Sequence, residues 1–188
     1  MKHWSFHKTL CKETPTYKAN QEVVAAKKTL AEQEAALGVD HRETLVTVSR
    51  IGYLLQEQGK LKEAEPFLRR SLEGRERTLG RDHPCTLTAV NNIGALLQGQ
   101  GKLSLAEPFL RRFLEGSERT LGRDHPGTLT AVNNKGRLLQ DQGKLKEAEP
   151  FLRRSLEGLE RTLGRDHPHT RDSVRNLRLL MEALERAK

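Results

Sequence analysis

The sequence predicts an all-α fold in which antiparallel helix pairs stack into a right-handed superhelical solenoid. The hexapeptide LGRDHP begins at residues 79, 121 and 163, and an imperfect copy, LGVDHR, begins at residue 37, so the copies start 42 residues apart. Within each copy, apolar residues recur at helical spacing. Aromatic residues make up 4% of the chain and charged residues 31%. This composition favours many small helix contacts, and a helix pair of this size buries its apolar face only against neighbouring pairs.

The period divides the chain into six segments, taken here in order. The first is a basic segment that we expect to be poorly ordered or degenerate, because Pro15 breaks its pattern and it carries no apolar stripe. The second resembles the second helix of a partial repeat. The segments are 1–19 (basic segment), 20–36 (partial repeat), 37–78 (repeat 1), 79–120 (repeat 2), 121–162 (repeat 3) and 163–188 (C-terminal capping helix). Repeats 2 and 3 agree at 34 of 42 positions.

The first helix of a repeat is expected, in repeat 2, from about Pro84 to Gln100. Proline suits the first helical position, and the preceding Asp82 and His83 suit the cap. The apolar arc of this helix follows i, i+3, i+4 spacing and consists of Leu87, Val90, Ile93, Gly94 and Leu97. This arc is predicted to face the core.

The second helix is expected from about Leu103 to Leu121, between Gly101, which separates the two helices, and Gly122, a plausible residue after the helix end. Its apolar arc consists of Leu103, Ala106, Leu110, Phe113, Leu114 and Leu121. A proline lies inside this helix in each repeat, at Pro66, Pro108 and Pro150. Because an interior proline removes a backbone hydrogen bond, we expect a late helix start or a mild bend there.

The last segment repeats only the first helix. Its apolar positions are Val174, Leu177, Leu180, Met181 and Leu184. The opposite face is rich in charge, as in RDSVRNLR. A helix of this kind is expected to cap the open end of a stack.

The pattern resembles the tetratricopeptide repeat in a 42-residue form. The residues that carry the resemblance are Ile93, Gly94, Leu97, Gly101, Ala106, Leu110 and Phe113. The sequence of the repeat, with LLQxQGKLxEAEPFLRR, is similar to the repeats of kinesin light chains and nephrocystin-type proteins. The resemblance covers roughly residues 21–188 and implies a non-catalytic scaffold or adaptor that binds proteins. It does not extend to the heptad coiled coil that joins kinesin light chains to their heavy chains, which puts a kinesin heavy chain in doubt as a partner.

In the family that this chain resembles, one stripe of the first helices faces a concave groove in which extended peptides bind. The stripe is rich in amides, which offer paired donors and acceptors for a peptide backbone, and its arginines favour acidic partners. The candidate binding residues are Ser49, Arg50, Tyr53, Gln56, Asn91, Asn92, Gln98, Asn133, Asn134, Arg137, Gln140, Arg175 and Asn176. The alternative is that these amides bond only to one another or to water.

Lys135 departs from the core pattern, because it takes the position of Ile51 and Ile93. A buried ammonium group is costly unless it reaches water along its stem. We therefore expect Lys135→Ile to raise the stability.

The net charge of +8 keeps a second class of function open, namely binding of nucleic acid or an anionic surface. The paired arginines 69–70, 111–112 and 153–154 suit phosphate. However, arginine and glutamate alternate at i, i+4 and i+8, as in Arg111, Glu115 and Arg119, which is typical of a solvated, salt-bridged face.

No nucleophile motif or phosphate loop is found, so neither an enzyme nor a cofactor is expected. The recurring turn histidines lie one repeat apart, too far to share a metal ion. The sequence has no apolar run long enough to span a membrane, and with two unpaired cysteines it favours a reducing, cytoplasmic location. Association with the cytoskeleton is left open.

Overall fold

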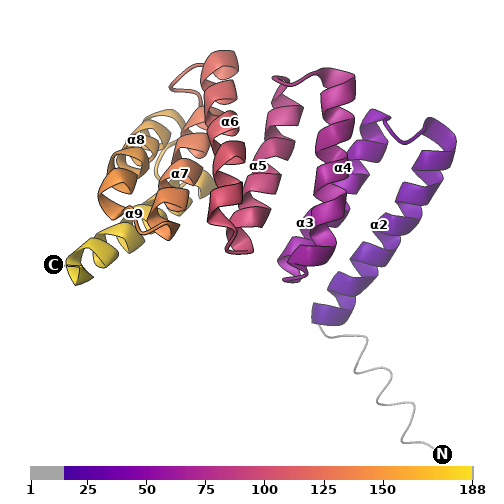
Figure 1. Cartoon of the computed structure of the whole chain (residues 1–188), viewed down its shortest axis with the longest axis horizontal. Coiled ribbons are helices and arrows are strands. Elements are labelled where there is room, and N and C mark those ends of the chain that lie inside the picture. The colour runs from indigo at the N-terminus through magenta and orange to yellow at the C-terminus, as the bar shows by residue number, and fades with distance from the viewer. Residues whose placement is uncertain (1–14, 188) are drawn as a thin grey trace, which may run out of the picture. The chain divides into compact units, whose positions relative to one another are not determined.

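The computed structural model describes residues 15–187, and it confirms the all-α prediction, with helices joined by short turns and no strand in that range (Figure 1). The described residues form two compact units, divided between residues 80 and 81, and each is described by itself. The first unit contains α2 (Pro15–Leu37), α3 (Arg42–Glu57) and α4 (Leu61–Leu79). The second contains α5 (Pro84–Gly99), α6 (Leu103–Leu121), α7 (Pro126–Asp141), α8 (Leu145–Leu163) and α9 (Pro168–Arg186).

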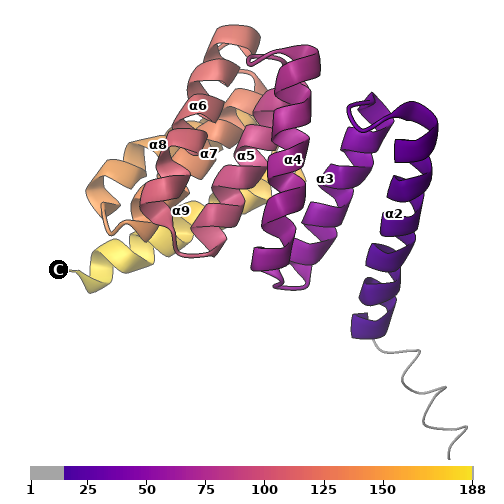
Figure 2. The same cartoon turned by 45° about the vertical axis from the view of Figure 1, so that its right-hand side comes forward.

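Within each unit, helices that follow one another in the chain pack together. In the first unit α3 packs against both α2 and α4. In the second unit each helix packs against the next, and α7 also touches α5 and α9, so the odd-numbered helices form one layer (Figure 2). The even-numbered helices α6 and α8 pack against the helices of that layer.

Each helix pair is locked by two leucine-to-glycine contacts. In the pair α7 and α8, Leu152 lies so close to Gly136 that a Cβ atom there would stand 2.7 Å from the Leu152 Cδ2 atom. The reciprocal contact places Leu129 against Gly158. The same two contacts recur in the other pairs, between Gly94 and Leu110, Leu87 and Gly116, Gly52 and Leu68, and Leu45 and Gly74. The conserved spacing of these residues within the repeat therefore fixes how closely the two helices approach.

The histidine of each turn caps the N-terminus of the helix that follows. His83 Nδ1 accepts a hydrogen bond from the backbone N–H of Cys85 at 3.1 Å, and His125 Nδ1 accepts one from Gly127 at 3.0 Å. His41 and His167 do the same. The aspartate before each histidine has a different partner: Asp82 binds Arg119 at 2.5 Å, at the far end of the same repeat. The histidine is thus the cap, and the aspartate ties the turn to the second helix.

Of the two alternatives predicted for the internal proline, a late helix start or a mild bend, the late start was wrong. Helix α6 begins at Leu103, with Pro108 inside it, and Ala106 N–H donates to the Lys102 carbonyl in the first turn. The apolar arc of this helix is buried or half-buried apart from Leu121, which is 36% exposed because it stands at the helix end. In α9, Val174 is 45% exposed rather than part of the core.

Lys135 has a partner that the sequence did not reveal. Its Nζ atom lies 3.0 Å from Oε1 of Glu107 in α6, and its side chain is 15% exposed. The other oxygen of Glu107 accepts a hydrogen bond from Gln142 at 3.0 Å. These two bonds, with the hydrogen bond from Gln142 as the larger effect, lower the pKa of Glu107.

At the N-terminal end, α2 begins at Pro15, earlier than the expected start at residue 20, and buries Val23, Ala26 and Leu30. The prediction of a poorly ordered start concerns residues 1–14 in the main, and these lie outside the described residues. None of the helices that the structure describes is both long and apolar enough to cross a membrane.

Candidate functional site

The predicted binding residues all lie on the odd-numbered helices. In the second unit, α5 carries Asn91, Asn92 and Gln98, α7 carries Asn133, Asn134, Arg137 and Gln140, and α9 carries Arg175 and Asn176. In the first unit, α3 carries Ser49, Arg50, Tyr53 and Gln56. Because α5, α7 and α9 are neighbours, their residues can form one surface.

A constant register of 43 residues joins these helices. Asn134 Nδ2 donates to Asn91 Oδ1 at 2.7 Å, across α7 and α5. Asn176 Nδ2 donates to Asn133 Oδ1 at 3.3 Å, across α9 and α7. The members of each pair are 43 residues apart, one more than the repeat. Within the second unit, each of α5 and α7 therefore meets the next first helix with an offset of one residue, and the amides are brought together as a ladder.

The pair of Asn133 and Asn176 in this ladder is bonded inside the fold. Asn133 and Asn176 are each only 7% exposed, and Ser173 adds a second hydrogen bond to Asn133 Oδ1 at 3.4 Å. These two side chains are therefore largely enclosed, and their polar groups are already bonded within the protein. For these two residues the structure supports the alternative in which amides bond to one another.

Other members of the ladder remain accessible. Asn91 and Asn134 are half-buried, and their mutual bond uses one donor and one acceptor, which leaves the Asn91 N–H₂ group and the Asn134 oxygen with capacity for further bonds. Asn92 and Gln140 are also half-buried. A ligand backbone alongside α7 would thus meet both donors and acceptors.

Exposed charged side chains border the amides. Arg137 is exposed on α7, and Arg175 on α9 pairs with Asp172 at 3.4 Å with its side chain 63% exposed. A hollow of about 110 Å³ lies between α7 and α9 at this point. It is lined by Thr130, Asn133, Asn134, Arg137, Leu159, His169, Asp172, Ser173, Arg175 and Asn176. Sequence reasoning missed five of these, namely Thr130, Leu159, His169, Asp172 and Ser173.

Acidic residues also belong to this face and limit its positive charge. Gln98 Nε2 donates to the carboxylate of Asp141 at 2.5 Å, again in the 43-residue register. Asp141 is exposed. Gln98 is therefore already engaged by the protein, and the face alternates in charge along its length.

The candidate residues of the first unit divide into one that is internal and others that are accessible. Ser49 Oγ lies 2.6 Å from Ser71 Oγ and accepts a hydrogen bond from Arg75 at 3.2 Å, so it faces α4 and not a ligand. Arg50 is exposed, Gln56 is half-buried and Tyr53 is 58% exposed. The hydroxyl group of Tyr53 donates a hydrogen bond to Glu57, and this bond raises the pKa of Tyr53.

The arginines of the even-numbered helices are engaged differently from the prediction. Arg153 binds Glu149 at 2.8 Å within its own helix, but Arg161 binds Asp124 of the turn at 3.1 Å. Arg154 reaches across to Glu118 at 2.9 Å. The alternation Arg111, Glu115, Arg119 does not form a continuous ladder, because Arg119 turns to Asp82. This outer face is nevertheless extensively neutralised.

Chemistry beyond binding finds no support in the described part of the chain. Among residues 15–187 no group of three or more His, Cys, Asp and Glu could hold a metal ion. The turn histidines accept the hydrogen bonds that cap the helices.

Paired helices whose first members present one row of polar side chains define a helical repeat protein. The chain belongs to the tetratricopeptide repeat family: the model of that repeat matches residues 43–118, 90–161 and 128–188. No curated protein matches the chain.

Solved structures show the same fold. The crystal structure of the nearly identical TPR-like repeats of a putative kinesin light chain from Podospora anserina has a TM-score of 0.73 at 22% identity, over 99% of this chain and 90% of that one. A point variant of that protein gives 0.75 at 20% identity, with the same coverage. BtubC (BKLC) from P. vanneervenii gives 0.71 at 18% identity, over 88% of this chain and 66% of that one. The resemblance to kinesin light chain repeats is therefore confirmed for the fold.

Proposed function

We propose that this chain is a non-catalytic scaffold that binds a segment of a partner protein along the face formed by α5, α7 and α9. The tetratricopeptide repeat is a protein-interaction fold, and nothing among the described residues points to catalysis. The observation that carries the more specific proposal is the 43-residue register, which aligns amides from successive helices beside the exposed Arg137.

The partner segment is proposed to be extended and to contain acidic residues. The half-buried amides Asn91, Asn92 and Asn134 offer donors and acceptors at a spacing set by the helix layer, which suits a peptide backbone. Arg137 and Arg175 would favour carboxylates on that segment, while Asp141, about one helical turn beyond Arg137, would disfavour them at the C-terminal end of α7. Charge would thereby set the direction in which the segment lies.

On the first unit, Arg50, Tyr53 and Gln56 are the residues proposed for contact. Tyr53 presents a large exposed ring with a polar tip, the kind of side chain that is enriched in protein interfaces. Ser49, Asn133 and Asn176 are not proposed as direct contacts, because their side chains already form hydrogen bonds within the protein.

The test starts from a peptide selected on the purified chain out of a phage-displayed random library. Its dissociation constant is then measured by fluorescence anisotropy for wild type and for Arg137→Ala. This variant carries the residue that repeat 2 has at the same position, Ala95, so the helix should tolerate it. We expect binding to weaken by about tenfold, the loss of one partly desolvated charge contact.

The matched control is Arg111→Ala, which removes the same charge from the exposed outer face of α6. It should change the dissociation constant by less than about twofold. Loss of binding in the control with retention in Arg137→Ala would assign the site to the outer face. Tight, strongly salt-dependent binding of single-stranded RNA in place of peptide would favour the nucleic-acid alternative.

A further inference from the structure

The outward face of α9 differs from the matching face of every other first helix. In α3, α5 and α7 this face packs against the second helix of the same repeat, through a leucine and a glycine such as Leu129 and Gly136. In α9 the residues one repeat later are Arg171 and Arg178. Both halves of the leucine-to-glycine lock are thus replaced by arginine.

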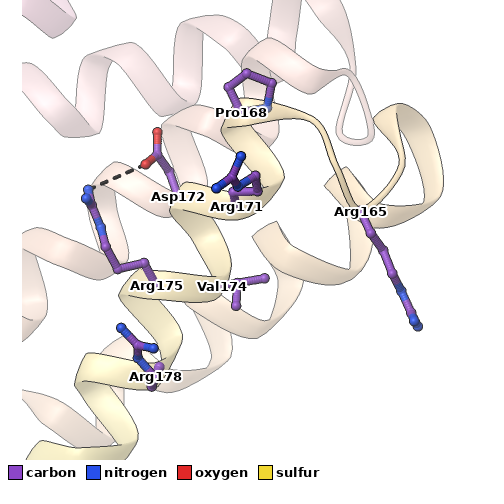
Figure 3. Close-up of a pocket in the computed structure, with 7 residues that line it drawn as sticks. All are labelled: Arg165, Pro168, Arg171, Asp172, Val174, Arg175 and Arg178. Atoms are coloured by element: carbon purple, nitrogen blue, oxygen red, sulfur yellow. Dashed lines mark ion pairs between the residues drawn. The ribbon is translucent and has the colours of Figure 1, made fainter.

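The result is an open hollow bordered by positive charge, with a volume of about 600 Å³. Figure 3 shows its side chains spaced along one length of α9, with Arg165 reaching from the preceding turn. It is lined by Arg165, Pro168, Arg171, Asp172, Val174, Arg175 and Arg178. Val174, 45% exposed, supplies an apolar spot among the arginines.

The arginines are only loosely neutralised. Arg175 lies 3.4 Å from Asp172, Arg165 lies 3.5 Å from Glu160, and Arg178 lies 3.8 Å from Glu182. These separations exceed the ~2.7–2.9 Å of a charge-assisted hydrogen bond, and exposed pairs of this kind contribute little. Arg171 has no ion pair or side-chain hydrogen bond among the described residues. A carboxylate ligand therefore displaces only weak contacts.

We propose that this face of α9 is a second docking site, for an acidic peptide segment of a partner protein with an apolar residue between its carboxylates. The guanidinium groups would bind carboxylates, and Val174 would contact the apolar side chain. A helix packed as α8 packs on α7 does not fit, because Arg178 has its Cβ and long side chain where Gly136 admits Leu152. The segment is therefore proposed to lie further out, at the reach of the arginine side chains.

An acidic peptide fits this face better than nucleic acid does. None of the residues that line the hollow is aromatic, so no platform for base stacking is present there. The two sites share Asp172 and Arg175, but variants can distinguish them, because Arg171 and Arg178 do not line the groove hollow and Arg137 does not line this one.

The probe is a fluorescein-labelled oligoglutamate peptide with one central leucine, titrated against the full chain by fluorescence anisotropy. Arg171→Gln with Arg178→Gln should weaken binding about tenfold, the loss of two exposed charge contacts. The control, Arg111→Gln with Arg123→Gln, removes the same two charges from exposed positions in the same unit. It should change binding by less than about twofold.

Charge reversal separates recognition from damage to the fold. Arg171→Glu with Arg178→Glu should lose the acidic peptide and gain binding to the matching oligolysine peptide, whereas a misfolded variant would gain nothing. Replacing the central leucine of the probe by serine should weaken binding to wild type and leave Val174→Ser nearly unaffected.

Several outcomes would overturn the proposal. Equal losses in the α9 variant and the control would mean attraction to net charge only. Unchanged binding in Arg171→Gln with Arg178→Gln, combined with a loss in Arg137→Ala, would place acidic peptides in the groove and leave the proposed function standing. Stronger competition by oligo(dT) than by unlabelled peptide at the same arginines would make the site one for nucleic acid.

Discussion

Glu107 joins two consecutive repeats through a single carboxylate. Its two oxygens bind Lys135 and Gln142, both from the following repeat, whereas the matching Glu149 binds Arg153 in its own helix. The substitution of an isoleucine by Lys135 in repeat 3 is thus accompanied by a change in how the glutamate of repeat 2 is used. An ammonium group that seemed misplaced in the sequence is a paired one in the fold.

This pairing reverses the expectation for Lys135→Ile. The variant leaves the partly buried Glu107 with only Gln142, so we expect the free energy of unfolding to fall by about 0.5–1 kcal/mol in urea titrations. Lys135→Ile with Glu107→Gln should recover part of the loss, because no unpaired charge remains. A single variant more stable than wild type would show that burial of the isoleucine outweighs the ion pair.

The lowered pKa of Glu107 predicts a pH dependence of stability. A carboxyl group whose folded pKa lies below its unfolded value, about 4.3, contributes stability above that pH. The contribution is lost as the pH falls through the folded pKa. Wild type should therefore lose more unfolding free energy between about pH 6 and pH 3 than Glu107→Gln does. Parallel pH profiles for the two proteins would argue against the effect.

At the scale of the helix, the leucine-to-glycine lock determines which substitutions a pair accepts. An alanine at Gly136 would place its Cβ 2.7 and 2.8 Å from Leu152 Cδ2 and Cγ, and 3.2 Å from the Cβ of Phe151. Helix propensity favours alanine over glycine by about 1 kcal/mol. Overpacking costs about 1–3 kcal/mol. The packing cost is expected to win.

Gly136→Ala should accordingly lower the unfolding free energy by about 1–2 kcal/mol in chemical denaturation. The control is Gly99→Ala in α5, an exposed position at which α7 carries Asp141. That variant should be neutral or slightly stabilising. In a Leu152→Ala background the cost of Gly136→Ala should shrink, since the clashing atoms are gone. A full cost in that background would mean that the backbone, not Leu152, limits the approach.

Helix bounds were largely predictable, because Gly101, Gly122 and Pro84 carry backbone constraints of their own. The same local signals could not show that Asp82 leaves the cap to His83 and pairs with Arg119, since that contact joins residues 37 apart. Nor could they show that Asn133 is buried by Asn176, because the 43-residue register arises only from packing. For the candidate surface, the sequence showed that the residues share the first helices of the repeats but could not separate internal amides from accessible ones.

On the scale of the whole molecule, protection should follow the number of neighbouring helices. Helix α7 packs against α5, α6, α8 and α9, whereas α2 packs against α3. Hydrogen exchange followed by mass spectrometry should therefore show amides in the middle of α7 exchanging at least about tenfold more slowly than those in the middle of α2. Equal rates in the two helices would indicate that the chain opens as one cooperative body.

The asparagine pair at the middle of a first helix works as a two-sided connector. In α7, Asn134 bonds backwards to α5 and Asn133 bonds forwards to α9. A copied 42-residue block therefore brings both halves of the joint with it, and such an array can be lengthened by duplication without any new contact having to be invented. In α9 the backward half persists as Asn176, while the forward half has become Arg175. In α9, the asparagine that would bond forwards to a further helix is therefore replaced by an exposed arginine.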